Sequence, residues 1–454
     1  MRRNLVKVLM LVMLIALCIW QIALLWLGDM SSHNFLVKKD AIQNVILVQP
    51  KAMWVNTGGI AYKIDDSKNE YNMLINELRS FVVKGVKNSE IDKDTDKEYE
   101  ELLSMPGILY EYDLNLGLQE LIGNRVADVP NNIAVSQIFV DMSEYTDNKT
   151  SLYLVTEDAQ NIYKATFYNR LEGHQKIMER FNNPEVTQNL MGYQPSATSN
   201  QKQNIAGNNF LPLNTKEAPI EYKVLQVTNP IEENAGAEKI NILEQYVNSF
   251  FDNPLLKEID EKGDGSVIFS ENMRAIVKYE PAGTLEFNYT SANQETKLTS
   301  IERLTKVMAF IRGCTGIPTF LKERIYLTQI VNQGEESIYK FDYKYKGFSM
   351  QLSDAIKDKL GLDHILEITI KNNQVIRGKW SVLKIEEDAR TNYGTAKVSR
   401  GFREIVDEMY EVYIKNKDAN SPLEAVQCQY VMDTTNGEMN LKWVVLYQNK
   451  WYYP

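Results

Sequence analysis

The side chains that could do chemistry are few in this sequence, and they do not gather. Three histidines and three cysteines are scattered along 454 residues: His33, His174, His364, Cys18, Cys314 and Cys428. A zinc site needs clustered ligands at short spacing, and the sequence has no CxxC pair and no histidine beside a cysteine. The sequence therefore predicts neither a metal site nor a cofactor.

The two cysteines in the body of the chain have two interpretations. Outside the cell, Cys314 and Cys428 could form a disulfide, but two lone cysteines are more often small, buried apolar side chains. Cys314 also follows the C-terminal end of a predicted helix, where partial negative charge disfavours a thiolate. We predict no reactive thiol, and the disulfide stays open.

Acidic clusters are the remaining candidates for catalysis. One consists of Glu258, Asp260 and Glu261, and another runs from Glu386 to Asp388. Both lie in charged stretches that are typical of a solvated surface. The phosphate-binding loop, the G-x-S-x-G elbow and the HExxH motif are absent from the sequence. We predict that the protein is not an enzyme. A wall hydrolase with two carboxylates about 5–10 Å apart in a cleft is an alternative.

The strongest signal in the sequence is an apolar run near the N-terminus. It extends from Val8 to Leu27, and Gln21 is its only strongly polar member. A helix of this length spans about 30 Å, the thickness of a bilayer core. The sequence therefore predicts a single transmembrane anchor at residues 8–28.

Charge on the two sides of the run sets its orientation. Arg2, Arg3 and Lys7 precede it, and the next Lys or Arg is Lys38. The positive-inside rule then places a stub, residues 1–7, in the cytoplasm and the body of the chain outside. A cleaved signal peptide is the alternative, but its apolar part is only about 7–15 residues and ends in small residues. We therefore predict an uncleaved, single-pass protein of the cell membrane with an extracytoplasmic C-terminal body.

The body is acidic. The formal net charge of the whole chain is −10 although its N-terminal stub is basic. Such a body repels the phosphates of nucleic acid and gains no attraction to anionic lipid. Nucleic acid is therefore excluded as a partner.

Helical and strand-like patterns alternate through the body and would have to position any site. An amphipathic helix followed by a strand pair recurs around residues 238–290, 299–345 and 398–447. The second of these begins with Thr299 and Glu302 at capping-box spacing and ends its helix near Gly313. The pattern predicts an α+β fold of antiparallel sheets with helices packed on one face.

A polar segment gives the first domain boundary. Between Tyr193 and Asn214 the chain is rich in Asn, Gln and Ser and poor in aliphatic residues, as in a long loop. We predict an N-terminal α+β domain at 35–191, a linker or loop at 192–220, a central α+β domain at 221–345 and a C-terminal α+β domain at 346–454.

Several local patterns together resemble the YycH regulatory protein family, with a C-terminal portion similar to YycI. They are Val48-Gln49-Pro50, Ser266-Val267-Ile268-Phe269-Ser270 before the hairpin Arg274–Tyr289, Tyr339-Lys340-Phe341-Asp342-Tyr343 followed by Gly347, and the closing strands Glu424–Val431 and Leu441–Val445. The family usually has a proline shortly before the last tryptophan of this pattern, whereas Asn440-Leu441-Lys442 precede Trp443 here. The similarity spans most of the chain, and none of these motifs is catalytic.

The resemblance implies a regulator of YycG (also called WalK), an essential membrane sensor histidine kinase of Gram-positive bacteria that adjusts cell-wall metabolism. Contacts would run through the transmembrane helix and the outer domains. In the anchor, Ala16 and Ala23 would permit close helix approach, and Gln21 would hydrogen-bond across the interface. A YycI-like protein is a further candidate partner, and a homodimer is left open.

An extracytoplasmic ligand-binding or protease-inhibitory module associated with the wall is the alternative function. A deep apolar pocket lined by Tyr and Trp would favour it.

Overall fold

The computed structural model describes Met13 and residues 48–454, apart from 67–68, 86–90, 95–97, 123–132, 144–148, 157–160, 169, 189, 197–204, 206–209, 214–219, 252, 273, 291–297, 388–394, 399 and 415–420. The chain divides into two compact units, Met1–Gln43 and Asn44–Pro454. The predicted anchor, with Ala16, Gln21 and Ala23, lies outside the described residues, Met13 excepted. Within the described part of the chain, no helix has the length and apolar character needed to cross a membrane. The anchor and its orientation stay predictions.

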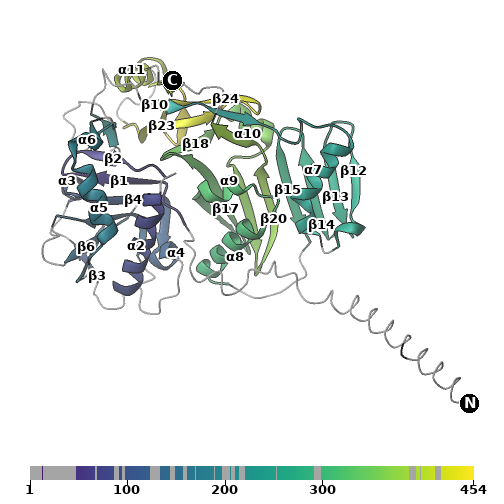
Figure 1. Ribbon diagram of the computed structural model, residues 1–454, viewed down its shortest axis with the longest axis horizontal. Helices are drawn as coiled ribbons and strands as arrows, with labels where there is room; N and C mark the ends of the chain where they lie inside the picture. Colours follow the sequence, from purple (N-terminus) through teal and green to yellow (C-terminus); the bar gives the residue numbers. More distant parts are fainter. Residues whose placement is uncertain are drawn as a thin grey trace, which may run out of the picture. The chain divides into compact units, whose positions relative to one another are not determined.

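The first half of the body forms a nine-stranded antiparallel sheet in the order β3-β7-β6-β5-β4-β1-β2-β8-β9 (Figure 1). Its strands are β1 (Ala52–Asn56), β2 (Ala61–Lys63), β3 (Ile91–Asp94), β4 (Gly107–Gly117), β5 (Ala134–Asp141), β6 (Thr150–Val155), β7 (Ile162–Phe167), β8 (Tyr193–Pro195) and β9 (Phe210–Pro212). The helices of this half are α2 (Asn69–Gly85), α3 (Tyr99–Ser104), α4 (Leu118–Ile122), α5 (Glu172–Phe181) and α6 (Pro184–Thr187).

Helices cover both faces of this sheet, which corrects the expectation of helices on one face. Successive side chains of a strand point to opposite faces. Trp54 and its partner Leu109 lie in one cluster with Tyr99, Leu102 and Leu103 of α3. On the opposite face, Tyr110 hydrogen-bonds His174 of α5 and lies 3.3 Å from the carbonyl oxygen of Leu74 in α2. The apolar pattern of a helix sequence predicts which side of that helix is buried. It does not predict which face of the sheet the helix packs against.

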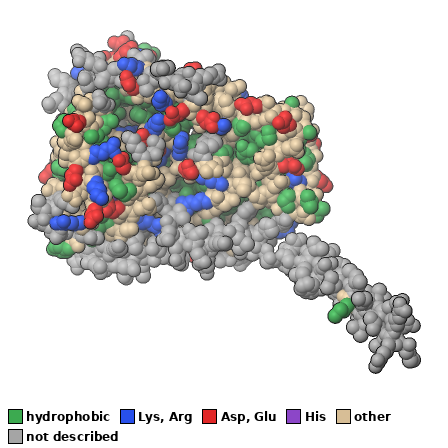
Figure 2. Space-filling model, in the orientation of Figure 1, with side chains coloured by type: hydrophobic (Ala, Val, Ile, Leu, Met, Phe, Trp, Pro, Cys, Tyr) green, Lys and Arg blue, Asp and Glu red, His purple; other side chains and the backbone are tan. Residues whose placement is uncertain are grey.

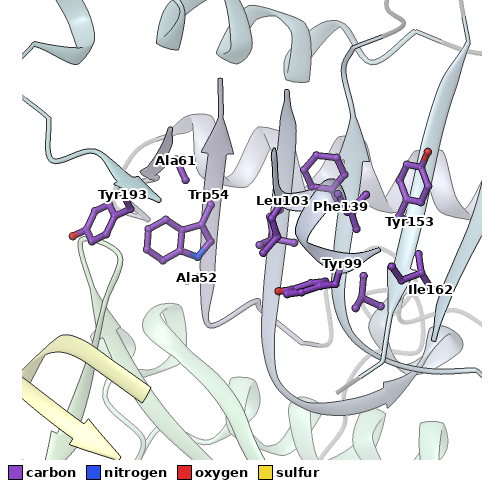
Figure 3. Packing of buried hydrophobic residues seen from close by; sticks show 12 residues of the cluster. Ala52, Trp54, Ala61, Tyr99, Leu103, Phe139, Tyr153, Ile162 and Tyr193 are labelled. Atoms are coloured by element: carbon purple, nitrogen blue, oxygen red, sulfur yellow. The ribbon is translucent and has the colours of Figure 1, made fainter. Parts of the chain in front are cut away.

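The core on the α3 face is aromatic. Figure 3 shows Tyr193 next to Trp54, Phe139 and Tyr153 on neighbouring strands, and Tyr99 of α3 near Leu103 and Phe139. The rings of Trp54 and Tyr193 meet edge to face, with centroids 5.1 Å apart. Such pairs add about 0.5–1.5 kcal/mol to the burial of apolar area. The contact between Trp54 and Tyr193 holds β8 against β1, although β8 comes much later in the chain.

Gly107, at the start of β4, leaves no room for a side chain beside β5. A Cβ atom at this position would lie 2.3 Å from the ring of Phe139 and 2.5 Å from the carbonyl oxygen of Val140. We predict that Gly107→Ala lowers the free energy of unfolding by about 1–3 kcal/mol, because backbone cannot yield as a flexible side chain can. Chemical unfolding of the purified protein measures it. Gly313→Ala is the control, since its Cβ would meet nothing within 4 Å, and equal midpoints for both variants would refute the prediction.

The second half of the body forms a 14-stranded sheet in the order β12-β13-β14-β15-β20-β19-β17-β18-β23-β24-β11-β21, with β16 on β17 and β25 on β24. The strands are β11 (Leu225–Thr228), β12 (Glu258–Glu261), β13 (Val267–Glu271), β14 (Ala275–Glu280), β15 (Thr284–Tyr289), β16 (Ile325–Gln333), β17 (Glu336–Tyr345), β18 (Phe348–Leu352), β19 (Leu366–Lys371), β20 (Gln374–Ser381), β21 (Lys384–Glu387), β23 (Ala425–Met432), β24 (Gly437–Tyr447) and β25 (Lys450–Tyr452). β18 and β23 pair in parallel, and the other pairs are antiparallel. β10 (Glu221–Lys223) pairs separately with β22 (Thr395–Lys397).

The helices of this half are α7 (Ala237–Val247), α8 (Ser300–Gly313), α9 (Thr319–Arg324), α10 (Asp354–Leu360) and α11 (Phe402–Glu408), with 3-10 turns at Asn248–Phe250 and Pro254–Leu256 and a π-helical turn at Met409–Ile414. Three of these helices, α7, α8 and α11, were predicted and occur in the predicted order, whereas α9 and α10 were not predicted. α7 precedes the β14–β15 hairpin, α8 precedes β16–β17, and α11 precedes β23–β24. The capping box at Thr299 and Glu302 is confirmed, with hydrogen bonds in both directions. The α+β class with antiparallel sheets is therefore confirmed.

The segment predicted as a linker, 192–220, is not loop throughout. Its residues Tyr193–Pro195 and Phe210–Pro212 are β8 and β9, which extend the first sheet beyond β2. The central and C-terminal regions also share one sheet, because β17 pairs with both β18 and β19. The predicted domain boundaries themselves stay predictions.

Candidate functional site

A buried lysine joins the two sheets and is the most unusual polar group of the described body. Lys344, near the end of β17, is only 1% exposed. Its Nζ donates to the carbonyl oxygen of Pro50 at 2.5 Å and hydrogen-bonds the hydroxyl of Tyr71 in α2. Nζ also lies 4.4 Å from the centre of the Tyr71 ring. A side chain of the second sheet is thus held by backbone and aromatic groups of the first half.

Burial governs the charge of this lysine. Removal from water lowers the pKa of Lys344 to about 7; Asp66 opposes this effect and Lys63 adds to it. At neutral pH the folded protein therefore contains both charged and neutral Lys344. Since the side chain is buried, this lysine is inaccessible as a nucleophile, and its role is in the contact between the two sheets.

The turn that follows Lys344 docks on the first half as well. Lys346 and Gly347 have φ of 49° and 81°, which is the backbone conformation of a tight hairpin turn between β17 and β18. The amide of Gly347 donates to Oδ1 of Asp66 at 3.0 Å. A Cβ atom at 347 would lie 2.7 Å from the carbonyl oxygen of Ile64, so only glycine fits this approach.

A second lysine lies beside the same junction. The Nζ of Lys63 is 5.2 Å from the ring centre of Trp54 and 5.0 Å from that of Phe348, so it lies between rings of the two halves. Burial lowers the pKa of Lys63 to about 8, against the attraction of Glu111. Together Lys344, Lys63, Asp66 and Tyr71 form what we call the junction cluster.

His174 lies in a hydrogen-bonded chain that resembles an acid–base relay. Its Nδ1 is 2.6 Å from Oε2 of Glu77, and its Nε2 is 2.8 Å from the hydroxyl of Tyr110. Burial lowers the pKa of His174, although Glu77 opposes the shift. Because His174 is 0% exposed and Tyr110 is 0% exposed, no substrate reaches them. These hydrogen bonds fasten α5 to α2 and β4.

The other catalytic candidates from the sequence are an exposed acidic cluster and two buried cysteines. Glu258, Asp260 and Glu261 are exposed on β12, as expected for a solvated surface, and Figure 2 shows acidic and basic side chains interspersed on the face it draws. Cys314 and Cys428 are both buried and free. Burial raises the pKa of Cys314 to about 12, so the thiol is protonated. Within the described residues, no three His, Cys, Asp or Glu side chains could hold a metal.

Sequence reasoning missed the junction cluster. In β17, Tyr339, Phe341, Tyr343 and Tyr345 alternate as a buried face, and this alternation places Lys344 on the solvent side. The structure covers that side with residues of the first half. No pattern within β17 indicates that residues of the first half cover this side of the strand.

No family model and no curated protein matches the sequence. YycH from Bacillus subtilis superposes with a TM-score of 0.56 over 90% of this chain and 96% of that one, at 12% sequence identity. The chain has a YycH-like fold. The resemblance noted from the sequence is therefore confirmed for the fold, and at this identity it carries no residue roles.

Two further solved structures match with lower scores. An uncharacterized protein from Eubacterium rectale has a TM-score of 0.33 and 9% identity, over 52% of this chain and 80% of that one. The C-terminal domain of YpeB from Bacillus megaterium has a TM-score of 0.23 and 11% identity, over 46% and 88%.

Proposed function

We propose that this protein regulates a membrane sensor histidine kinase of the YycG type, as a protein anchored by its N-terminal helix. The observation that carries the proposal is the YycH-like fold, which extends over 90% of the chain. The apolar run Val8–Leu27 and the acidic body agree with it.

Regulation by contact requires that the protein binds two states of the kinase with different affinity. In this proposal the anchor packs against the transmembrane helices of the kinase, and the extracytoplasmic body contacts its outer domain. Ala16 and Ala23 permit close approach, and Gln21 supplies a hydrogen bond within the membrane. A YycI-like protein could join the same assembly, and the output would be an adjustment of cell-wall metabolism.

The test is Gln21→Leu, alone and combined with Ala16→Leu and Ala23→Leu. We expect Gln21→Leu to remove about 0.6–2 kcal/mol of helix association, which weakens co-purification with the kinase about 3- to 30-fold. The bulky leucines should weaken it further. Kinase output, measured as phosphorylation of the cognate response regulator, should move toward that of cells lacking the protein.

Leu17→Ile is the control because it lies one turn from Gln21 and changes neither polarity nor volume. It should leave association and output as in wild type. If the triple variant associates and signals as wild type does, contact through the anchor is refuted. If the protein and the kinase never co-purify and deletion leaves output unchanged, kinase regulation itself is refuted.

A further inference from the structure

The second sheet begins with a strand whose outer side has no partner strand among those described. β12 is the first strand in the order of this sheet, and it pairs with β13 alone. Figure 1 shows it as the outermost strand of its part of the sheet. All four residues of β12 are exposed to solvent. An edge of this kind presents N–H and C=O groups that can pair with another extended chain.

The hairpin between β12 and β13 shows which backbone groups point outward. The amide of Lys262 donates to the carbonyl oxygen of Ser266 at 2.9 Å. In an antiparallel ladder, residues bonded to the neighbouring strand alternate with residues whose N–H and C=O point away from it. Asp260, two residues before Lys262, is therefore bonded to β13. The N–H and C=O groups of Ile259 and Glu261 point to the open side.

Two leucines in the turn before β12 are held in solvent. The side chains of Leu255 and Leu256 are 93% and 66% exposed. Oδ1 of Asn253 caps the turn by accepting from the amide of Leu255 at 3.1 Å. After the turn, Nζ of Lys257 lies 2.7 Å from Oε1 of Glu244 in α7. The leucines are thus an apolar contact that is already ordered before a partner binds, which lowers the entropy cost of binding.

The charges on β12 discriminate among possible partners. Asp260 pairs with Lys262, while Glu258 and Glu261 make no ion pair within the part of the chain that the structure describes. Antiparallel pairing with a second copy of β12 would set a carboxylate opposite a carboxylate: Asp260 opposite Asp260, Glu261 opposite Glu261, or Glu258 opposite Asp260, depending on the register. Like charges directly opposite each other are destabilising. The edge therefore disfavours a second copy and favours a basic segment.

Strand alternation gives the order of residues that such a segment needs. Ile259 lies opposite the buried Phe269, so its side chain is on the core face of the sheet, although it is 42% exposed. Glu258 and Asp260 project from the other face. A segment in which Lys or Arg alternates with apolar residues would set its cations beside these two carboxylates. Its apolar side chains would lie beside Ile259 and the two leucines of the turn.

We propose that β12 binds an extended segment of a partner protein in which basic and apolar residues alternate. Hydrogen bonds to the backbone of Ile259 and Glu261 add the segment to the sheet, as in other complexes formed by strand addition. The cations of the segment face Glu258 and Asp260, and these charges select it over acidic or neutral segments. This surface lies in the body of the chain, so the inference does not rest on the proposed contact between the anchor and a kinase.

The experiment titrates two short blocked peptides against the full-length protein in nanodiscs of phosphatidylcholine, whose lipids carry no net charge. One peptide repeats Lys-Val four times, and the other repeats Lys-Lys-Val-Val twice, so that only the order of residues differs. We expect the alternating peptide to bind at least about tenfold more tightly, because only it matches the two faces of the strand. It should also slow amide hydrogen exchange at Ile259 and Glu261.

Charge reversal tests where the alternating peptide binds. The double variant Glu258→Lys with Asp260→Lys should weaken its binding by at least about tenfold and should bind a peptide that repeats Glu-Val four times. The matched control is Glu386→Lys with Asp433→Lys, which makes the same change in net charge. Both control residues are exposed and pair with a lysine, as Asp260 does, and both lie toward the other end of the strand order. The control should bind the lysine peptide as wild type does.

Two single variants test the backbone and the leucines. Ile259→Pro removes an outward N–H, which an edge strand tolerates, and should weaken binding about tenfold. Leu255→Ser should weaken it about 3- to 10-fold, because apolar burial is lost. Thermal unfolding shows whether each variant is folded, and the charge reversal decides if Ile259→Pro is not. The proposal is overturned if the two lysine peptides bind alike, if charge reversal leaves binding unchanged, or if the protected amides lie elsewhere.

Discussion

Replacing Glu77 with alanine is expected to lower the free energy of unfolding by roughly 3–5 kcal/mol, the largest effect of any single change considered for this protein. The Glu77 carboxylate accepts three hydrogen bonds, from Nδ1 of His174 at 2.6 Å and from the amides of Gly173 and His174 at 2.9 Å each. Alanine leaves all three donors without an acceptor. His174 is wholly buried and the Glu77 side chain is 24% exposed, so water can enter the vacated space but replaces the three hydrogen bonds only in part.

The negative charge of the Glu77 carboxylate strengthens the expectation that its loss destabilises the protein. Burial raises the pKa of the Glu77 carboxyl, but the hydrogen bonds from His174 and Gly173 outweigh it and hold the pKa below its usual value. The carboxylate is therefore charged at neutral pH and binds its donors tightly. The neutral His174 donates from Nδ1 to Glu77 and accepts the Tyr110 hydroxyl at Nε2, so loss of Glu77 also frees the ring that fixes Tyr110.

Chemical unfolding of the purified protein measures the change. Glu179→Ala is the control, since Glu179 lies on α5, the helix that carries His174, and accepts an exposed hydrogen bond from Gln175. It should alter stability by less than about 0.5 kcal/mol. Glu77→Gln should recover only part of the loss, because an amide offers one acceptor oxygen where the carboxylate offers two. Equal stability of Glu77→Ala and Glu179→Ala would contradict the role given to this chain of hydrogen bonds.

Replacing Lys344 with methionine is expected to change how stability depends on pH. The pKa of Lys344 is lowered to about 7 in the folded protein, and that of an exposed lysine is about 10.5. Between these values the unfolded chain binds a proton that the folded chain has lost, so the free energy of unfolding rises as pH rises. Over the range from pH 7 to 9.5 this single group contributes on the order of 3 kcal/mol.

The quantity to measure is the stability of wild type minus that of Lys344→Met, at pH 6.5 and at pH 9.5. The difference removes the contributions of the titratable groups that both proteins share and that do not interact with Lys344. It should rise by about 3 kcal/mol in favour of wild type. Lys340→Met is the control, because Lys340 lies on the same strand and its Nζ is 3.8 Å from Asp363. Curves for wild type and Lys344→Met that stay parallel across this range would show that Lys344 does not titrate between the sheets.

The junction cluster could not be predicted from the sequence. Lys344 and Pro50 are separated by 294 residues, and Asp66 and Gly347 by 281. Sequence patterns report on neighbours within one turn of helix or one strand, whereas these contacts depend on how two sheets meet. The alternation in β17 correctly gives the face of Tyr339, Phe341 and Tyr343 as buried, but it places Lys344 in solvent.

Dependence on distant contacts also explains why the predictions for the first half were wrong about the helix faces and about β8 and β9. α3 packs on the face of Trp54 while α5 packs on the face of Tyr110, although each helix has only one buried side. β8 and β9 lie in a polar stretch without alternation, and their pairing with β2 and with each other makes them strands. Short edge strands of this kind take their structure from a neighbour rather than from their own residues.

The sequence by itself determined the class of the fold, the three units of a helix followed by a strand pair in the second half, and the start of α8 at the Thr299 capping box. These follow from local rules, because periodicity and caps act over a few residues. It also predicts the anchor at 8–28, where Gln21 remains the residue to test. Only the tertiary structure decided the burial of Lys344 and the burial of His174 between Glu77 and Tyr110. Each depends on which distant surface covers a residue, since burial sets its charge and its access to partners.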